Sequence, residues 1–264
     1  MENVIYWYSG TGNSLSFARR LADQLEGETV LYPIVNILHG DTEYPRPEKV
    51  CGFVFPLYGA EAPWPVLAAI EQMDIPEDAY IFAVGTCNER GGVSIDDFNN
   101  FLKRCSRHLS YGRKVSMPGN CLPSNQQEND ERLFYENSEV QRTAENINKR
   151  MTGSYHGGNP NMNTVDDRRN MFGKTGFGQW SVSDSCIRCG LCAEICPMNN
   201  ITLEDSGPVF GNNCGYCFGC YHWCPQKAVY LATFRAFGKE GRDQYHHPDI
   251  SSNDIAAQKK TVVK

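Results

Sequence analysis

No run of apolar residues in this 264-residue sequence approaches the ~20 residues that a membrane-spanning helix needs. The first residues, Met1 to Val4, also lack the basic stretch and the apolar stretch that together make a signal peptide. We therefore expect a cytoplasmic protein without a membrane span.

A basic patch is missing as well. The sequence has 25 lysines and arginines against 31 aspartates and glutamates, which gives a formal net charge of -6. A polyanion binds where basic side chains gather, and no segment of this sequence gathers them. Nucleic acid is therefore excluded as an expected partner, whereas the oligomeric state stays open.

Cysteine is abundant. Twelve cysteines are many for a protein in a reducing compartment, where thiols bind metals more often than they form disulfides. Four of them are scattered, namely Cys51, Cys87, Cys105 and Cys121. The other eight lie between Cys186 and Cys224, so their positions point to one metal-binding region.

The eight cysteines form two copies of one pattern. Each copy is C-x₂-C-x₂-C-x₃-C-P, and the second begins 28 residues after the first, since 214 minus 186 is 28. Two-residue gaps let one loop present three thiolates to adjacent corners of a cubane iron–sulfur cluster, so a fourth ligand comes from elsewhere. Zinc sites are the alternative, but they usually show two well-separated C-x₂-C pairs. The pattern favours iron–sulfur clusters over zinc or disulfides.

Residues 1–151 alternate short apolar runs with segments in which apolar residues recur every three or four positions. Such alternation predicts an α/β fold with a parallel sheet that is covered by helices on both faces. We predict strands at residues 4–8, 29–32, 50–55, 80–84 and 114–117, and helices at 15–25, 66–73, 95–109 and 130–151.

The rest of the chain divides into three parts. Residues 152–180 are rich in Gly, Asn and Asp, which is typical of a linker or an extended loop. Residues 181–236 hold the eight cysteines and form a second, smaller α+β domain. The polar tail at 237–264 is expected to be mobile.

A glycine-rich loop lies between the first predicted strand and the first helix. Its sequence is Ser9-Gly10-Thr11-Gly12-Asn13-Ser14. The glycines allow close backbone approach, and the hydroxyls and the N–H groups of a helix N-terminus suit a phosphate. The loop lacks the lysine of a Walker A motif and the third glycine of the dinucleotide fingerprint. It predicts a phosphate monoester held by neutral donors, with an ordinary strand-to-helix turn as the alternative.

Residues 181–236 resemble the bacterial ferredoxin module that carries two [4Fe–4S] clusters. The resemblance implies that each block supplies three ligands to one cluster and a fourth ligand to the other. One cluster would be held by Cys186, Cys189, Cys192 and Cys224. The second would be held by Cys214, Cys217, Cys220 and Cys196.

The glycine-rich loop and the strands around it resemble flavodoxins, which have a doubly wound five-stranded parallel sheet. Flavodoxins bind FMN at the carboxyl ends of the strands, at the topological switch point. The resemblance implies that Ser9, Gly10, Thr11, Gly12, Asn13 and Ser14 hold the FMN phosphate. It also implies contacts to the flavin ring from Pro56, Leu57, Tyr58, Gly59, Thr86, Cys87, Asn88, Gly91 and Gly92. Tyr58 is the expected stacking aromatic, with Trp64 and Tyr8 as alternatives.

The two modules in this order resemble the flavodoxin–ferredoxin fusions of the EFR1 family, in which the implied role is electron transfer. Clusters carry one electron each and a flavin carries one or two, so this chain is expected to pass electrons between two [4Fe–4S] clusters and FMN. The alternative is a reductase of a small molecule at FMN, with the clusters as electron inlet. No acid–base constellation decides whether the chain is an enzyme, and its expected partners are redox proteins or a small-molecule acceptor.

Overall fold

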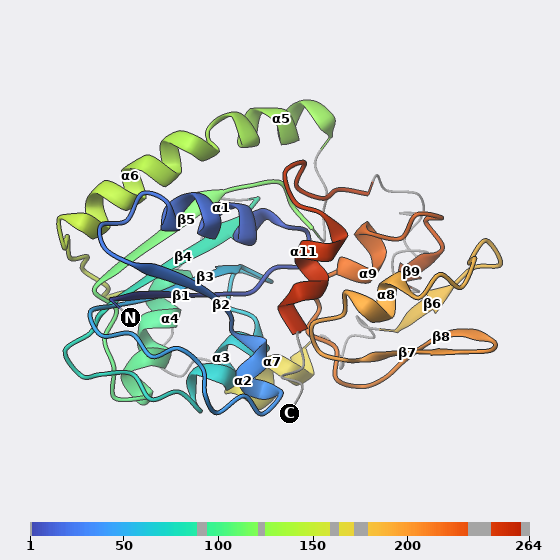
Figure 1. The fold of residues 1–264 in the computed structure, drawn as a ribbon, viewed down its shortest axis with the longest axis horizontal. Coiled ribbons are helices and arrows are strands. Elements are labelled where there is room, and N and C mark those ends of the chain that lie inside the picture. Colours follow the sequence, from blue (N-terminus) through green and yellow to red (C-terminus); the bar gives the residue numbers. More distant parts are fainter. Residues whose placement is uncertain are drawn as a thin grey trace.

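The computed structural model describes residues 2–88, 94–120, 125–158, 164–171, 179–231 and 244–259. An α/β domain from the N-terminal half lies beside a smaller module that contains the cysteines (Figure 1). Among the described helices, none combines the length and the apolar character needed to cross a membrane. The exact domain boundaries stay a prediction.

A five-stranded parallel sheet forms the centre of the α/β domain. Its strands are β1 (Asn3–Trp7), β2 (Thr29–Pro33), β3 (Val50–Pro56), β4 (Tyr80–Cys87) and β5 (Tyr111–Ser116). They lie in the order β2-β1-β3-β4-β5, and all neighbouring strands are parallel. This is the flavodoxin-like order, with its switch point between β1 and β3. The predicted fold class is confirmed.

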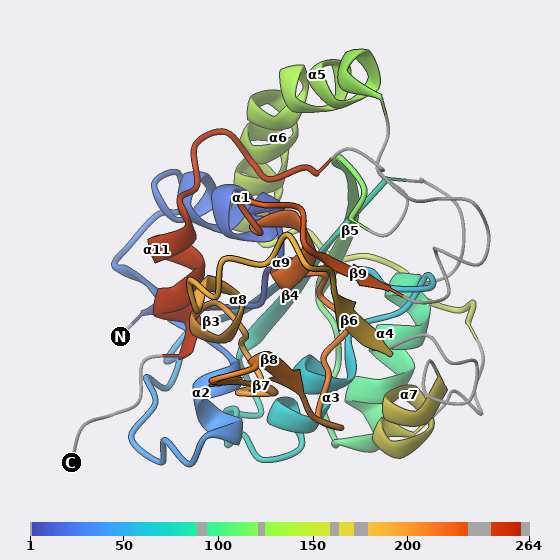
Figure 2. The same ribbon diagram turned by 90° about the vertical axis from the view of Figure 1, so that its right-hand side faces the viewer.

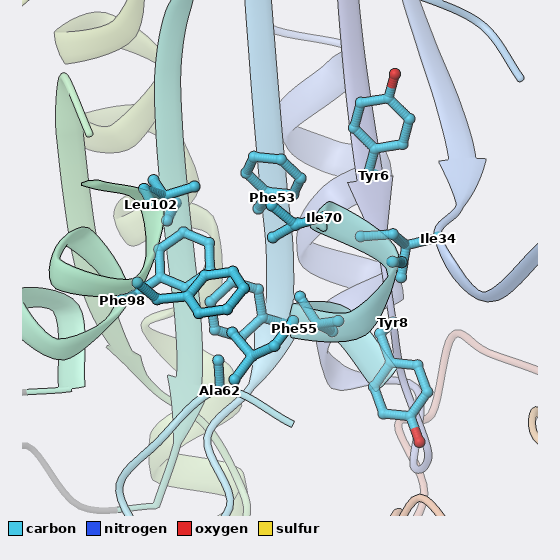
Figure 3. Packing of buried hydrophobic residues seen from close by; sticks show 14 of the residues in the cluster. Tyr6, Tyr8, Ile34, Phe53, Phe55, Ala62, Ile70, Phe98 and Leu102 are labelled. Atoms are coloured by element: carbon cyan, nitrogen blue, oxygen red, sulfur yellow. The ribbon is translucent and has the colours of Figure 1, made fainter. Parts of the chain in front are cut away.

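Both faces of the sheet are buried, which explains why the strands are continuous apolar runs. On one face, Tyr6, Phe53 and Phe55 pack against α3 (Trp64–Ile70) and α4 (Ser94–Arg104), and the short α2 (Val35–Leu38) joins this layer (Figure 3). On the other face, Ile5 and Val84 pack against α1 (Asn13–Ala22) and α6 (Glu136–Asn148). Each large apolar side chain buried in this way contributes roughly 1.5–3 kcal/mol to folding.

The helix predicted over 130–151 is two helices. α5 (Gln126–Phe134) begins after Asn125, whose side chain accepts a hydrogen bond from the Glu128 N–H at 2.9 Å. α6 begins after Tyr135. Phe134, which we placed in the apolar stripe of one long helix, is 79% exposed. The stripe therefore breaks at Phe134, and the two helices meet there.

Two segments that the composition suggested to be irregular are folded in part. The predicted linker contains α7 (Val165–Met171). The tail contains α11 (Ser252–Ala256) and the 3₁₀ helix η1 (Ala257–Lys259), and Ser251 and Asp254 form a complete capping box at the start of α11. The expectation of a mobile tail is wrong for residues 244–259.

In its described residues, the cysteine module contains two small antiparallel ribbons and two one-turn helices (Figure 2). β6 (Trp180–Val182) pairs with β9 (Val229–Leu231), and β7 (Ile201–Glu204) pairs with β8 (Gly207–Phe210). The helices are α8 (Leu191–Glu194) and α9 (Gly219–His222). Left-handed backbone recurs at equivalent positions of the two sequence copies, namely at Arg188, Gly190 and Asn199 and again at Tyr216, Phe218 and Lys227. The two loops therefore follow the same path.

Candidate cofactor sites

The eight cysteines line two separate cavities. One is lined by Cys186, Cys189, Cys192 and Cys224, and we call these residues the outer set. The other is lined by Cys196, Cys214, Cys217 and Cys220, which we call the inner set. In each cavity one cysteine comes from the opposite sequence block. The structure thus brings together the two sets that the ferredoxin resemblance implied.

Backbone N–H groups point at four of these sulfurs in pairs that follow the repeat. The Arg188 N–H donates to the Cys186 sulfur at 3.4 Å. At the equivalent position of the second block, the Tyr216 N–H donates to the Cys214 sulfur at 3.3 Å. The N–H four residues after Cys196 and the one four residues after Cys224 donate at 3.3 Å. Hydrogen bonds of this kind favour the thiolate over the thiol. The loops are therefore built for sulfurs that carry negative charge.

The sequence pattern of the cysteines indicates which metal group suits the two cavities. Within the ranges that the structure describes, no three His, Cys, Asp or Glu side chains converge closely enough to hold one ion. A zinc ion draws its ligands to about 2.0–2.3 Å, whereas a cubane spreads four thiolates over its corners. The described cysteines are also all free thiols. The residues fit an iron–sulfur cluster, for which the C-x₂-C-x₂-C-x₃-C-P spacing supplies the ligands.

The two sets differ in their exposure. Cys189 of the outer set is exposed, and Ile187 and Leu203, which line the same cavity, are 59% and 47% exposed. In the inner set burial raises the pKa of every thiol, that of Cys217 to about 12. Such a thiol becomes a thiolate only when a metal replaces its proton. Cys189 of the outer set is thus the cysteine that solvent and other molecules reach most readily.

The inner set faces the α/β domain. The Trp64 indole N–H donates to the Cys214 carbonyl at 2.9 Å, and the Trp223 indole N–H donates to the Gly10 carbonyl at 2.9 Å. Gly10 lies so close to the inner set that a Cβ atom on it would be 2.1 Å from the carbonyl oxygen of Cys217. The sequence did not predict this contact, because Trp64 and Trp223 lie far apart along the chain and belong to no common motif.

His222 joins three parts of the chain. Its Nε2 lies 2.6 Å from the Asn120 carbonyl oxygen, and its Nδ1 accepts a hydrogen bond from the Tyr245 N–H at 2.9 Å. Burial lowers the pKa of His222 to about 4. The ring is therefore neutral, with its proton on Nε2, and it acts as a structural hydrogen-bonding group.

The loop predicted to hold the FMN phosphate, residues 9–14, is buried throughout. The hydroxyl of Ser9 accepts a hydrogen bond from an N–H of the same loop at 3.1 Å. The hydroxyls of Ser14 and Thr86 lie 2.8 Å apart, and the Asn13 amide donates to a carbonyl after β5 at 2.7 Å. The polar atoms of these side chains are therefore hydrogen-bonded within the chain.

Residues 244–259, which we call the strap, cross this loop. The Gln258 side chain donates to the Ser9 carbonyl and accepts from the Ser9 N–H, both at 2.8 Å. The backbone N–H of His247 donates to the Thr11 carbonyl at 2.8 Å. No motif marks Gln258 or His247, so only the structure shows that they contact the loop.

The residues predicted to contact the flavin ring have mixed outcomes. Tyr58 is 7% exposed and belongs to the core on the α3 side of the sheet, and its carbonyl accepts a hydrogen bond from Arg168 at 2.8 Å. Tyr8 is fully buried, extends past the end of β1 in Figure 3, and donates to the Gly215 carbonyl at 3.4 Å. The ends of the paired strands β3 and β4 contain Pro56, Thr86 and Cys87. The Leu57 N–H donates to the Thr86 carbonyl, and Gly59 lies in a turn with a positive φ. Asn88 follows β4, whereas Gly91 and Gly92 lie outside the described residues.

Residues 182–202 match the family model described as a 4Fe-4S binding domain. The chain carries a 4Fe–4S binding segment. The match covers the first cysteine block, and the second block is assigned from its spacing and geometry. No curated protein matches the chain.

Several solved structures resemble a little over half of this chain. They include an azoreductase from Bacillus anthracis str. Sterne (12% identity, 56% of this chain and 100% of that chain, TM-score 0.36). The Trp repressor binding protein from Bacillus subtilis has 16% identity over 54% of this chain and 98% of its own, with a TM-score of 0.33. A flavodoxin from the domain Archaea has 8% identity over 55% and 99%, with a TM-score of 0.31. These TM-scores are too low to support a fold assignment, which rests on the strand order of the sheet instead.

Proposed function

We propose that this chain is an electron-transfer protein that holds two [4Fe–4S] clusters, one in the outer set and one in the inner set of cysteines. The observation that carries the proposal is the crossing of the sets, because each cavity takes three cysteines from one block and one from the other. Matched backbone N–H donors at both crossing cysteines support it.

The unequal exposure of the two sets gives the proposed path a direction in space. Cys189 and its exposed apolar neighbours make the outer cluster the port for external electron donors or acceptors. The helices α8 and α9, which carry cysteines of both sets, pack against each other and hold the clusters close together. Electrons then pass between the port and the inner cluster, which lies against the α/β domain.

We leave FMN out of the proposed path. The hydroxyls of Ser9 and Ser14 and the amide of Asn13 are hydrogen-bonded within the chain, and Tyr58 is packed in the core. In this arrangement the described side chains of the loop 9–14 do not fit a flavin phosphate. We therefore propose no step through FMN, and the alternative of a reductase that acts at FMN has no observation in its favour.

Cluster assembly in cysteine variants tests the proposal. The anaerobically prepared chain should contain the iron and sulfide of two clusters and show their visible absorbance, which reduction bleaches. Cys224→Ser should reproduce the spectroscopic defect of Cys189→Ser, and Cys196→Ser that of Cys217→Ser. Cys105→Ser is the matched control, because Cys105 belongs to neither set. A colourless protein that contains zinc would contradict the proposal. So would a spectroscopic defect in Cys224→Ser that matches the defect in Cys217→Ser.

A further inference from the structure

The switch point between β1 and β3, where flavodoxin-like folds bind their cofactor, is filled by the chain itself. Residues 214–219, which we call the inner loop, lie against the end of β1. A Cβ atom on Gly215 would be 2.4 Å from the hydroxyl oxygen of Tyr8, and one on Gly10 would be 2.1 Å from the Cys217 carbonyl oxygen. Backbone packed this closely leaves no layer for a ligand between the loop 9–14 and the inner loop.

The strap closes the other side of the loop. A Cβ atom on Gly12 would be 2.9 Å from the Ile250 Cβ and 3.0 Å from the His247 Cβ. The Tyr245 hydroxyl donates to the Asn13 side chain at 2.7 Å, in a buried position. The first residue of α1 thus has its amide oxygen bonded to the strap.

Charges near the loop are also matched within the chain. Arg19 and Arg20 of α1 pair with Asp254 and Asp249 of the strap. His247 lies 3.0 Å from Glu136 of α6, with both side chains buried. Cationic partners would stabilise a phosphate dianion at the start of α1, and burying the dianion without them is costly. The two arginines that lie nearest to the loop in sequence are therefore already paired with carboxylates of the strap.

We infer that the loop Ser9–Ser14 is the joint that seats the inner loop and the strap, and that the folded chain takes up no flavin phosphate there. The geometry carries this inference without the electron-transfer role; only the spectroscopic readout below depends on the inner cluster of the proposed function.

Flavin content is the first test. The full chain, purified anaerobically with its clusters, should release no FMN on acid denaturation. Added FMN should keep its fluorescence in a titration against the chain. One FMN per chain overturns the inference. The titration gives an answer even when no cluster is present, so it stands apart from failure of the proposed function.

Gly10→Ala tests the joint directly. The backbone of Gly10 does not require glycine, because its φ is not positive. The obstacle to alanine is Cys217, whose carbonyl oxygen and Cβ would lie 2.1 and 2.9 Å from the new Cβ. The variant should shift the EPR signal or potential of the inner cluster and leave the outer cluster unchanged. A free phosphate loop would tolerate alanine without any change at the clusters. An unchanged inner signal therefore overturns the inference.

Gln258→Ala gives a second measurement in case Gly10→Ala fails to fold. Gln258 is fully buried and makes two hydrogen bonds to Ser9, whereas Asn253 is an exposed amide on the same strap. Hydrogen exchange in residues 9–14 and 244–259 should rise at least tenfold in Gln258→Ala and stay at the wild-type rate in Asn253→Ala, since each lost buried bond costs about 1–3 kcal/mol. Equal exchange in the two variants overturns the inference.

Discussion

Replacing Arg168 with methionine should destabilise the chain strongly. Arg168 lies on α7, and its side chain is 2% exposed. Its guanidinium donates to the Tyr58 carbonyl at 2.8 Å and lies 2.7 Å from the Glu61 carboxylate. These two contacts hold α7 against the turn that follows β3.

The size of the effect follows from what the substitution leaves behind. Removing one partner of a buried ion pair costs about 3–5 kcal/mol, because the other charge stays buried without compensation. The side chain of Glu61 is 21% exposed, so water compensates in part and we expect the lower end, ~3 kcal/mol. The double variant Arg168→Met/Glu61→Gln removes both charges and should recover part of the loss.

The loss should grow with pH. Burial raises the pKa of Glu61 above 4.5, and the nearby Arg168 opposes this shift. Without the arginine the folded-state pKa rises further. A carboxyl with a raised pKa contributes stability below its unfolded-state pKa, and this contribution is lost as pH rises through the folded-state value. The deficit of Arg168→Met should therefore increase above about pH 4.5, and the double variant should lack this increase.

Urea unfolding under anaerobic conditions, followed by tryptophan fluorescence from pH 5 to 8, measures these free energies of unfolding. The neighbouring Arg169→Met is the control, because Arg169 is exposed and lies over the Trp64 ring at 4.9 Å from its centroid. It should cost about 0.5–1 kcal/mol. The reasoning is refuted when Arg168→Met costs no more than Arg169→Met, or when the double variant is as unstable as Arg168→Met.

Three further outcomes follow from the contacts. The Lys259 ammonium donates to the Ala193 carbonyl at 2.6 Å, and its charge opposes the rise that burial causes in the pKa of Cys196. It should stabilise the reduced inner cluster, so Lys259→Met should lower the potential of that cluster by tens of millivolts in an anaerobic titration, and an unchanged potential contradicts this. Gly12→Ala places a methyl group on a backbone with a φ of 98° and against the Ile250 side chain. The melting temperature should fall and hydrogen exchange in the strap should rise, whereas a wild-type melting curve would contradict the packing. A soluble iron chelator should remove iron in two phases of equal amplitude, the fast one from the outer set, and a single phase would argue against unequal exposure.

Local patterns predicted much of this molecule. The cysteine spacing acts within a few residues, so it indicated a metal-binding region, and the apolar runs located all five strands. The break at Tyr135 was missed because Phe134 has the right spacing for the stripe but faces solvent. α7 was missed because a seven-residue helix among polar residues has no apolar period. The strap was missed because Gln258 acts through hydrogen bonds to a residue far away in sequence.

The glycine-rich loop shows the limit of a motif most clearly. Its residues predicted a tight strand-to-helix turn, and residues 9–14 form one, with a left-handed Gly12 at the start of α1. The motif gave the shape of the turn and the polarity of its side chains. What the turn contacts depends on the tertiary packing of Tyr245 and Gly215, which no pattern within the loop encodes.

The bond between Ser9 and Gln258 also bears on how the protein is made. The two residues are 249 positions apart, and ribosomes add about 5–20 residues per second, so the loop waits for roughly 10–50 s before its partner exists. During that time β1 and the loop have emerged without the strap, and their polar groups are open to chaperones or small anions. Contacts across such separations also form slowly. The nascent chain therefore presents a surface that the finished protein hides, and pulse-labelling of ribosome-bound chains would detect it.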